Sequence, residues 1–155
     1  EQLRRVPYFR RLGVLGINRG EPASILRALR ELDRHLQDHP GALVVFFPQG
    51  RIWPSHRRPR GFERGVELLL RRLPLVALPI GLHAEPLTHV SPSFFVSVGE
   101  PIEGRPTAVE LERQVEVQLD AIQAFLAEHG EDAPRRWPSP HQPLPTAPAV
   151  VPGAR

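Results

Sequence analysis

Arginine side chains follow two apolar segments of the sequence and are the residues best suited to bind a ligand. Arg19 follows the first segment, and the loop after the second segment holds Arg51, Arg57, Arg58 and Arg60. A planar guanidinium group binds phosphate through two parallel hydrogen bonds. If the two segments are parallel strands, both groups of arginines open onto one edge of the sheet, where α/β proteins bind ligands. The pattern predicts a site for a phosphorylated or otherwise anionic ligand. Because all 20 basic residues are arginine, solvated loop arginines remain the alternative.

The loop after the second segment has a form that favours ligand binding. Residues 47–50, Phe-Pro-Gln-Gly, turn sharply out of an apolar run, and Gly50 lets backbone N–H groups approach a ligand closely. Residues 61–65, Gly-Phe-Glu-Arg-Gly, then open the next expected helix. Because the start of a helix carries partial positive charge, we expect both segments to serve the same anion site.

The order of the apolar segments indicates an α/β fold. The continuous run at residues 42–47 is typical of a central parallel strand covered on both faces. Residues 93–98 alternate and indicate a strand with one more polar face, near the sheet edge. Thr107 and Glu110 form a capping box that marks a helix start. We therefore expect a largely parallel central sheet flanked by helices. The expected strands are residues 14–17, 42–47, 75–81 and 93–98, and the expected helices are residues 24–38, 62–70 and 107–127.

Composition and length predict the domain organisation. With 155 residues, of which 41% are hydrophobic and 24% charged, the chain fits one domain plus a tail. Seven of the 19 prolines lie between Pro134 and Arg155, a stretch that buries too little apolar surface to order itself. We expect a domain at residues 1–131 and a disordered, proline-rich tail at residues 132–155. The absence of cysteine excludes disulfides and thiolate chemistry, and we expect a chain that starts at Glu1 without any methionine to be part of a longer protein.

Several segments together resemble the glycerolipid acyltransferases of the lysophosphatidic-acid acyltransferase type. Residues 13–19, Gly-Val-Leu-Gly-Ile-Asn-Arg, are similar to a family block of the form Gly-x-x-x-Ile-Asp-Arg. Residues 47–50 and 62–65 are similar to the two parts of the next block, Phe-Pro-Glu-Gly and Phe-x-x-Gly. Residues 75–80 are similar to the last block, a hydrophobic strand that ends in a proline, here Pro79. The resemblance covers residues 2–128 and implies the α/β core of that family.

The resemblance implies an acyl transfer whose general base this sequence lacks. In the family, a His-x-x-x-x-Asp block takes the proton of the acceptor hydroxyl as it attacks an acyl thioester. None of the seven histidines here has an aspartate five positions later. We therefore assign no catalytic residue in this chain and expect the block upstream of Glu1. His83 and His89 lie in an expected loop and are considered as general bases, but no carboxylate stands at a spacing that would indicate a catalytic pair.

The residues that match the family blocks imply where the substrate binds. Arg19 matches the family's phosphate-binding position, whereas Ile52 occupies its second arginine position and Arg51 lies one place early. Gln49 replaces the family's glutamate, which removes a charge and keeps a hydrogen-bonding amide. This departure favours an acceptor other than simple lysophosphatidic acid, such as a glycosylated or neutral lipid alcohol. The expected substrate-binding residues are Arg19, Phe47, Pro48, Gln49, Gly50, Arg51, Gly65 and Pro79.

The resemblance also implies the partners and the location of the protein. The acyl donor is a thioester of coenzyme A or of acyl-carrier protein, and no cofactor or metal is expected. We expect the protein at the cytoplasmic side of the cell membrane, bound peripherally or through an N-terminal part absent from this chain. Two alternatives stay open: a catalytically silent lipid-binding scaffold of the same fold, and a basic nucleic-acid-binding module, suggested by a sequence pI near 10.8. The net charge of only +3, with acidic residues interspersed, argues against nucleic acid.

Overall fold

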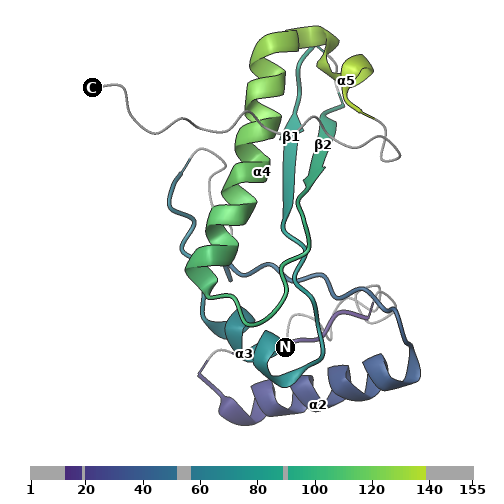
Figure 1. Cartoon of the computed structure of the whole chain (residues 1–155), viewed down its shortest axis with the longest axis vertical. Coiled ribbons are helices and arrows are strands. Elements are labelled where there is room, and N and C mark those ends of the chain that lie inside the picture. Colours follow the sequence, from purple (N-terminus) through teal and green to yellow (C-terminus); the bar gives the residue numbers. More distant parts are fainter. Residues whose placement is uncertain (1–12, 19, 52–56, 89–90, 139–155) are drawn as a thin grey trace. The chain divides into compact units, whose positions relative to one another are not determined.

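The computed structural model describes residues 13–18, 20–51, 57–88 and 91–138 of the chain. The described residues divide into two compact units, one within residues 1–46 together with 71–74 and the other within residues 47–70 together with 75–155. In chain order, the elements are α2 (Pro22–Asp38), α3 (Gly65–Arg72), β1 (Ile80–Glu85), β2 (Ser93–Val98), α4 (Ala108–His129), the 3-10 helix η2 (Gly130–Asp132) and α5 (Ala133–Arg136) (Figure 1).

The first unit contains one long helix, α2, whose flanking residues explain its limits. Pro22 stands in its first turn, where a residue without an N–H group costs no helical hydrogen bond. Just before the helix, the side-chain amide of Asn18 donates to the carboxylate of Glu21 at 2.7 Å. After the helix, Gly41 has a φ of +89°, a backbone conformation that glycine adopts without strain. The prediction of a helix over residues 24–38 is confirmed.

The prediction of a largely parallel central sheet is wrong. The described residues form one sheet of two antiparallel strands, β1 and β2. Residues 14–17 and 42–47, expected as strands, have no regular secondary structure. An apolar run rich in β-forming residues becomes a strand only where a second strand takes its backbone hydrogen bonds, and the described chain offers these segments no such partner. Leu43 and Val45 are 77% and 70% exposed, so this run is not buried as a central strand would be.

The third expected strand, residues 75–81, begins later than its apolar sequence predicts. β1 starts only at Ile80, and upstream of it Ala77 makes an isolated bridge to Ile102. Pro79 lies between the bridge and the strand, and proline has no N–H group to donate to a ladder. The apolar pattern alone therefore overestimates the length of pairing.

Strand β2 buries the more polar of its two faces, the one that carries Phe95 and Ser97. The strand over residues 93–98 is confirmed as β2. Its Phe95 and Ser97 are 1% and 0% exposed, whereas Phe94 on the opposite face is 66% exposed. Ser97 is paired with Gly81 of β1, and these small residues admit α4, which lies along both strands (Figure 1). The uncovered face, called here the apolar hairpin face, consists of the cross-strand pairs Ile80–Val98, Leu82–Val96 and Ala84–Phe94.

Helix α4 has well-marked ends and a close fit to the hairpin. The predicted capping box is confirmed, because the Glu110 N–H donates to Thr107 Oγ1 and the Thr107 N–H donates to the Glu110 carboxylate at 2.7 Å. The helix ends before Gly130, as the sequence predicts. Between these ends, the buried Ser97 hydroxyl donates to Gln118 Oε1 at 2.7 Å, which satisfies the polar group on the covered face.

Two apolar clusters hold the second unit together. The first joins α3 to the start of α4 and contains Val66, Leu70, Ala108 and Leu111. The second joins β2, α4 and α5 and contains Phe95, Ile122 and Ala133, with Trp137 packed against them. The rings of Phe95 and Trp137 meet edge to face with centroids 5.4 Å apart. Residues 133–137, assigned to the tail from composition, are therefore folded, because one large aromatic ring supplies the burial that the prolines do not. The expected disorder of residues 139–155 concerns a segment outside the described residues.

Candidate functional site

Residues 47–50 form the turn that the sequence predicts. The Gly50 N–H donates to the Phe47 carbonyl at 3.2 Å, and Gly50 has a φ of +61°. Pro48 and Gln49 are half-buried, whereas Phe47 is 71% exposed. The turn therefore presents an aromatic ring at the surface while its centre is partly covered.

A backbone hydrogen bond joins this turn to the segment that opens α3. The Glu63 N–H donates to the Pro48 carbonyl at 2.9 Å. Gly65, two residues further along, is the first residue of α3. The two parts of the motif, residues 47–50 and 62–65, thus lie side by side although a loop separates them in the sequence.

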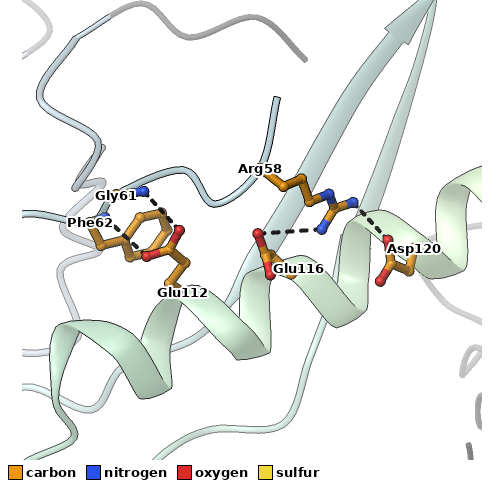
Figure 2. Close-up of polar contacts among 6 residues, drawn as sticks. All are labelled: Arg58, Gly61, Phe62, Glu112, Glu116 and Asp120. Atoms are coloured by element: carbon orange, nitrogen blue, oxygen red, sulfur yellow. Dashed lines mark hydrogen bonds and ion pairs between the residues drawn. The ribbon is translucent and has the colours of Figure 1, made fainter. Parts of the chain in front are cut away.

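The backbone amides next to this bond are already occupied by a carboxylate. The Gly61 N–H donates to Glu112 Oε1 at 2.8 Å, and the Phe62 N–H donates to Glu112 Oε2 at 3.2 Å (Figure 2). Glu112 belongs to α4 and is half-buried. The sequence predicts that a helix start near residues 61–65 adds partial positive charge to an anion site. In the structure, the amides of Gly61 and Phe62 precede α3 and are bound by a carboxylate of the chain itself.

Arg58, in the same loop, is bound by two further carboxylates of α4. Its Nη2 lies 2.6 Å from Asp120 Oδ1, and its Nη1 lies 3.5 Å from Glu116 Oε1 (Figure 2). Together with Glu112, these residues recur every fourth position and therefore share one side of the helix. Glu112, Glu116 and Asp120 are called here the acidic stripe.

Arg60 lies deeper beside the same stripe. It is only 6% exposed. Burial lowers the pKa of Arg60, and the neighbouring charge of Arg58 lowers it further, whereas the carboxylates of Glu116, Glu112 and Asp120 raise it. A guanidinium stays charged at neutral pH, so the stripe balances a charge that burial would otherwise penalise. The charges of Arg58 and Arg60, which were predicted to face an anionic ligand, are thus balanced by carboxylates of the chain itself.

The other predicted site residues are distributed over the chain. Arg51 directly follows the 47–50 turn and is exposed. Pro79 is buried at the base of the hairpin, where its carbonyl accepts from the Gly99 N–H at 2.9 Å. Its predicted role in substrate binding stays a prediction. Arg19, the predicted phosphate-binding residue, lies outside the described residues, and its role stays a prediction.

The sequence reasoning missed two carboxylate contacts that position this region. One is the acidic stripe, which was readable from the spacing of its three residues on an expected helix. The other is Glu67 of α3, a buried carboxylate whose Oε1 accepts from the Ala108 N–H at 2.9 Å. This bond satisfies a free amide at the start of α4 from a neighbouring helix. Only the tertiary structure brings Glu67 and Ala108 together, so the sequence near either residue does not predict their contact.

The structure also gives His83 a carboxylate partner. His83 lies in β1, not in a loop, and its Nε2 lies 3.0 Å from Glu85 Oε2. Residues two apart in a strand point to the same face, which explains the contact. A carboxylate on one ring nitrogen orients an imidazole as a general base requires. His89, the other histidine considered, lies outside the described residues.

Comparison of the chain with models of protein families, with curated proteins and with solved structures finds no match. Within the described residues, no group of three or more His, Asp or Glu side chains is placed to hold a metal ion. The described helices also include none that is long and apolar enough to cross a membrane.

Proposed function

We propose that the chain forms part of an acyltransferase that moves a fatty acyl group from a thioester of coenzyme A or acyl-carrier protein to a lipid hydroxyl. The turn at residues 47–50 and the segment at residues 62–65 bind the acceptor in this proposal, together with Arg51. Arg19 stays a separate, sequence-based prediction of a phosphate-binding residue. The general base belongs to a His-x-x-x-x-Asp block, which this sequence does not contain.

One observation carries the proposal: the hydrogen bond from the Glu63 N–H to the Pro48 carbonyl, 2.9 Å long. A motif whose two parts are distant in sequence has a joint function only if they meet in space, and this bond makes them meet. The proposal does not rest on the fold, because the parallel sheet that the family resemblance implies is absent from the described residues.

The apolar hairpin face adds support for a lipid substrate. Its pairs carry no charged side chain, and Leu82 and Phe94 are 56% and 66% exposed. Soluble monomers rarely expose a contiguous apolar surface of this kind without using it. Such a face suits the acyl chain of a lipid substrate, because an acyl chain has no polar group that needs a hydrogen-bond partner.

The test is an acyl-transfer assay on the full-length protein that contains this chain. Palmitoyl-coenzyme A is supplied with either lysophosphatidic acid or monoacylglycerol, and the product is detected by mass spectrometry. We expect transfer to at least one acceptor. Arg19→Ala raises the KM for the phosphorylated acceptor at least about tenfold, as loss of a charge-assisted hydrogen bond predicts. Arg105→Ala, the loss of an exposed arginine outside the motif, leaves this KM unchanged.

Other outcomes decide against the proposal. Lipid binding without any transfer, in a protein whose upstream region is complete, indicates the silent scaffold. Tight binding to DNA that weakens steeply with salt indicates the nucleic-acid module instead, because phosphate contacts release counterions.

A further inference from the structure

We propose that Glu112 is a positioning residue that holds the 47–50 turn in place from α4. This inference rests on the proposed function, because it assigns to the turn the task of receiving the acceptor. Glu112 itself touches no substrate in the proposal. It acts through the backbone of residues 61–63.

The Glu112 carboxylate binds two backbone amides of the loop. Its two oxygens accept from consecutive amides, those of Gly61 at 2.8 Å and Phe62 at 3.2 Å (Figure 2). Gly61 has a φ of +67°, a left-handed conformation in which a residue with a Cβ is strained. The glycine thus permits a backbone path on which both amides reach one carboxylate.

A further hydrogen bond connects the backbone that Glu112 holds to the 47–50 turn. The next amide along the chain, that of Glu63, donates to the Pro48 carbonyl at 2.9 Å. Three successive amides therefore connect α4 on one side with the turn on the other. Because Phe62 also packs against the cluster between α3 and α4, the middle of this connection is fixed by burial as well.

Other contacts still hold the loop to α4 if the Glu112 contact is lost. The loop then stays attached to the acidic stripe through Arg58, which contacts Glu116 and Asp120. Arg60, next to Gly61, also stays buried beside the stripe, but neither arginine replaces the acceptor that the amides of Gly61 and Phe62 lose. We therefore expect loss of Glu112 to loosen the turn without unfolding the unit.

Hydrogen exchange of this chain, followed amide by amide by NMR, tests the positioning role directly. Glu112→Ala removes both acceptors, and Glu112→Gln keeps one oxygen for one amide. We expect faster exchange at the amides of Gly61, Glu63 and Gly50, by about tenfold in the alanine variant and less in the glutamine variant. Glu128→Gln removes the same charge from an exposed position of α4 and leaves these rates unchanged.

The full-length enzyme gives the functional readout. Glu112→Ala raises the KM for the lipid acceptor severalfold with a smaller change in kcat, and Glu112→Gln restores part of the loss. A merely structural role would lower the amount of folded enzyme and leave the KM unchanged. If the alanine variant fails to fold, as judged by circular dichroism, the glutamine variant decides by the same two measurements.

The outcomes separate the two proposals. Unchanged exchange at Gly50 and Glu63 in a folded Glu112 variant overturns the positioning role, whatever the activity. Faster exchange in a protein without any acyl transfer supports the structural connection and refutes the proposed function. Faster exchange together with an unchanged acceptor KM refutes the role of the turn in acceptor binding.

Discussion

The close approach of α4 to the hairpin at Gly81 gives the sharpest test of the second unit. A Cβ atom at position 81 would lie 2.9 Å from Gln118 Cβ and 3.0 Å from both the Gln118 carbonyl carbon and the Leu119 backbone nitrogen. Carbon atoms in contact prefer separations of about 3.5–4.0 Å. Two of the three neighbours are backbone atoms of a helix, so the conflict cannot be relieved by rotating a flexible side chain.

The expected cost of Gly81→Ala follows from these distances. Helix α4 and β1 must move apart by several tenths of an ångström, and inserting a methyl group into a packed contact costs about 1–3 kcal/mol. Alanine also restricts the unfolded chain, which offsets about 0.4–1 kcal/mol. We expect a net loss of about 1–2 kcal/mol in the free energy of unfolding. In a domain of roughly 100 residues, each kcal/mol lowers the Tm by about 4–8 °C.

The assay is urea and thermal unfolding followed by far-ultraviolet circular dichroism. Gly65→Ala is the matched control, because a Cβ at the first residue of α3 meets nothing within 4 Å and glycine is a poor helix former. We expect this variant to be as stable as the parent chain or more stable. If Gly81→Ala also leaves the stability unchanged or raises it, α4 does not lie against β1 as described.

Two further predictions concern other contacts of the second unit. The pKa of Glu110 lies below its ordinary value, first because the Thr107 backbone N–H donates to its carboxylate and then because the Thr107 hydroxyl does. Its stabilising contribution is present above the pKa of the unfolded chain and is lost as the pH falls through the lower folded value. The stability difference between the parent and Glu110→Gln, measured by urea unfolding, therefore shrinks below about pH 4. Phe95→Ala costs about 3–5 kcal/mol in the same assay, whereas Phe94→Ala on the exposed face costs under about 1 kcal/mol; equal costs would contradict the described register.

Local signals in the sequence predicted α2 and α4 well. The capping box at Thr107 and Glu110, the glycine stop at Gly130 and the periodicity of residues 24–38 act within a few residues, and all three are confirmed. The sheet depends on which segment pairs with which, and that information is spread over the chain. For this reason the prediction of strands at the apolar runs 14–17 and 42–47 was wrong.

The candidate site shows the same division between local and tertiary information. Glycine and proline specify the turn at residues 47–50, and the structure has that turn. The binding partners of Arg58 lie on α4, with Asp120 62 positions later in the sequence, so the loop alone could not reveal them. The acidic stripe was visible in the spacing of Glu112, Glu116 and Asp120, but it had to be considered together with Arg58 to be understood.

Backbone amides and guanidinium groups attract any anion of suitable size, and a glutamate on a neighbouring helix is such an anion. An anion site inferred from positive groups alone therefore requires that the acidic side chains of the chain be placed elsewhere. Here Glu112 and its neighbours in the acidic stripe meet the amides and Arg58 directly. In the proposed function, ligand binding therefore falls to the turn that the amides hold, with its exposed Phe47. In our proposals, Glu112 affects binding because it fixes the position of that turn, which is why the exchange rate at Gly50 is the measurement that bears on both proposals.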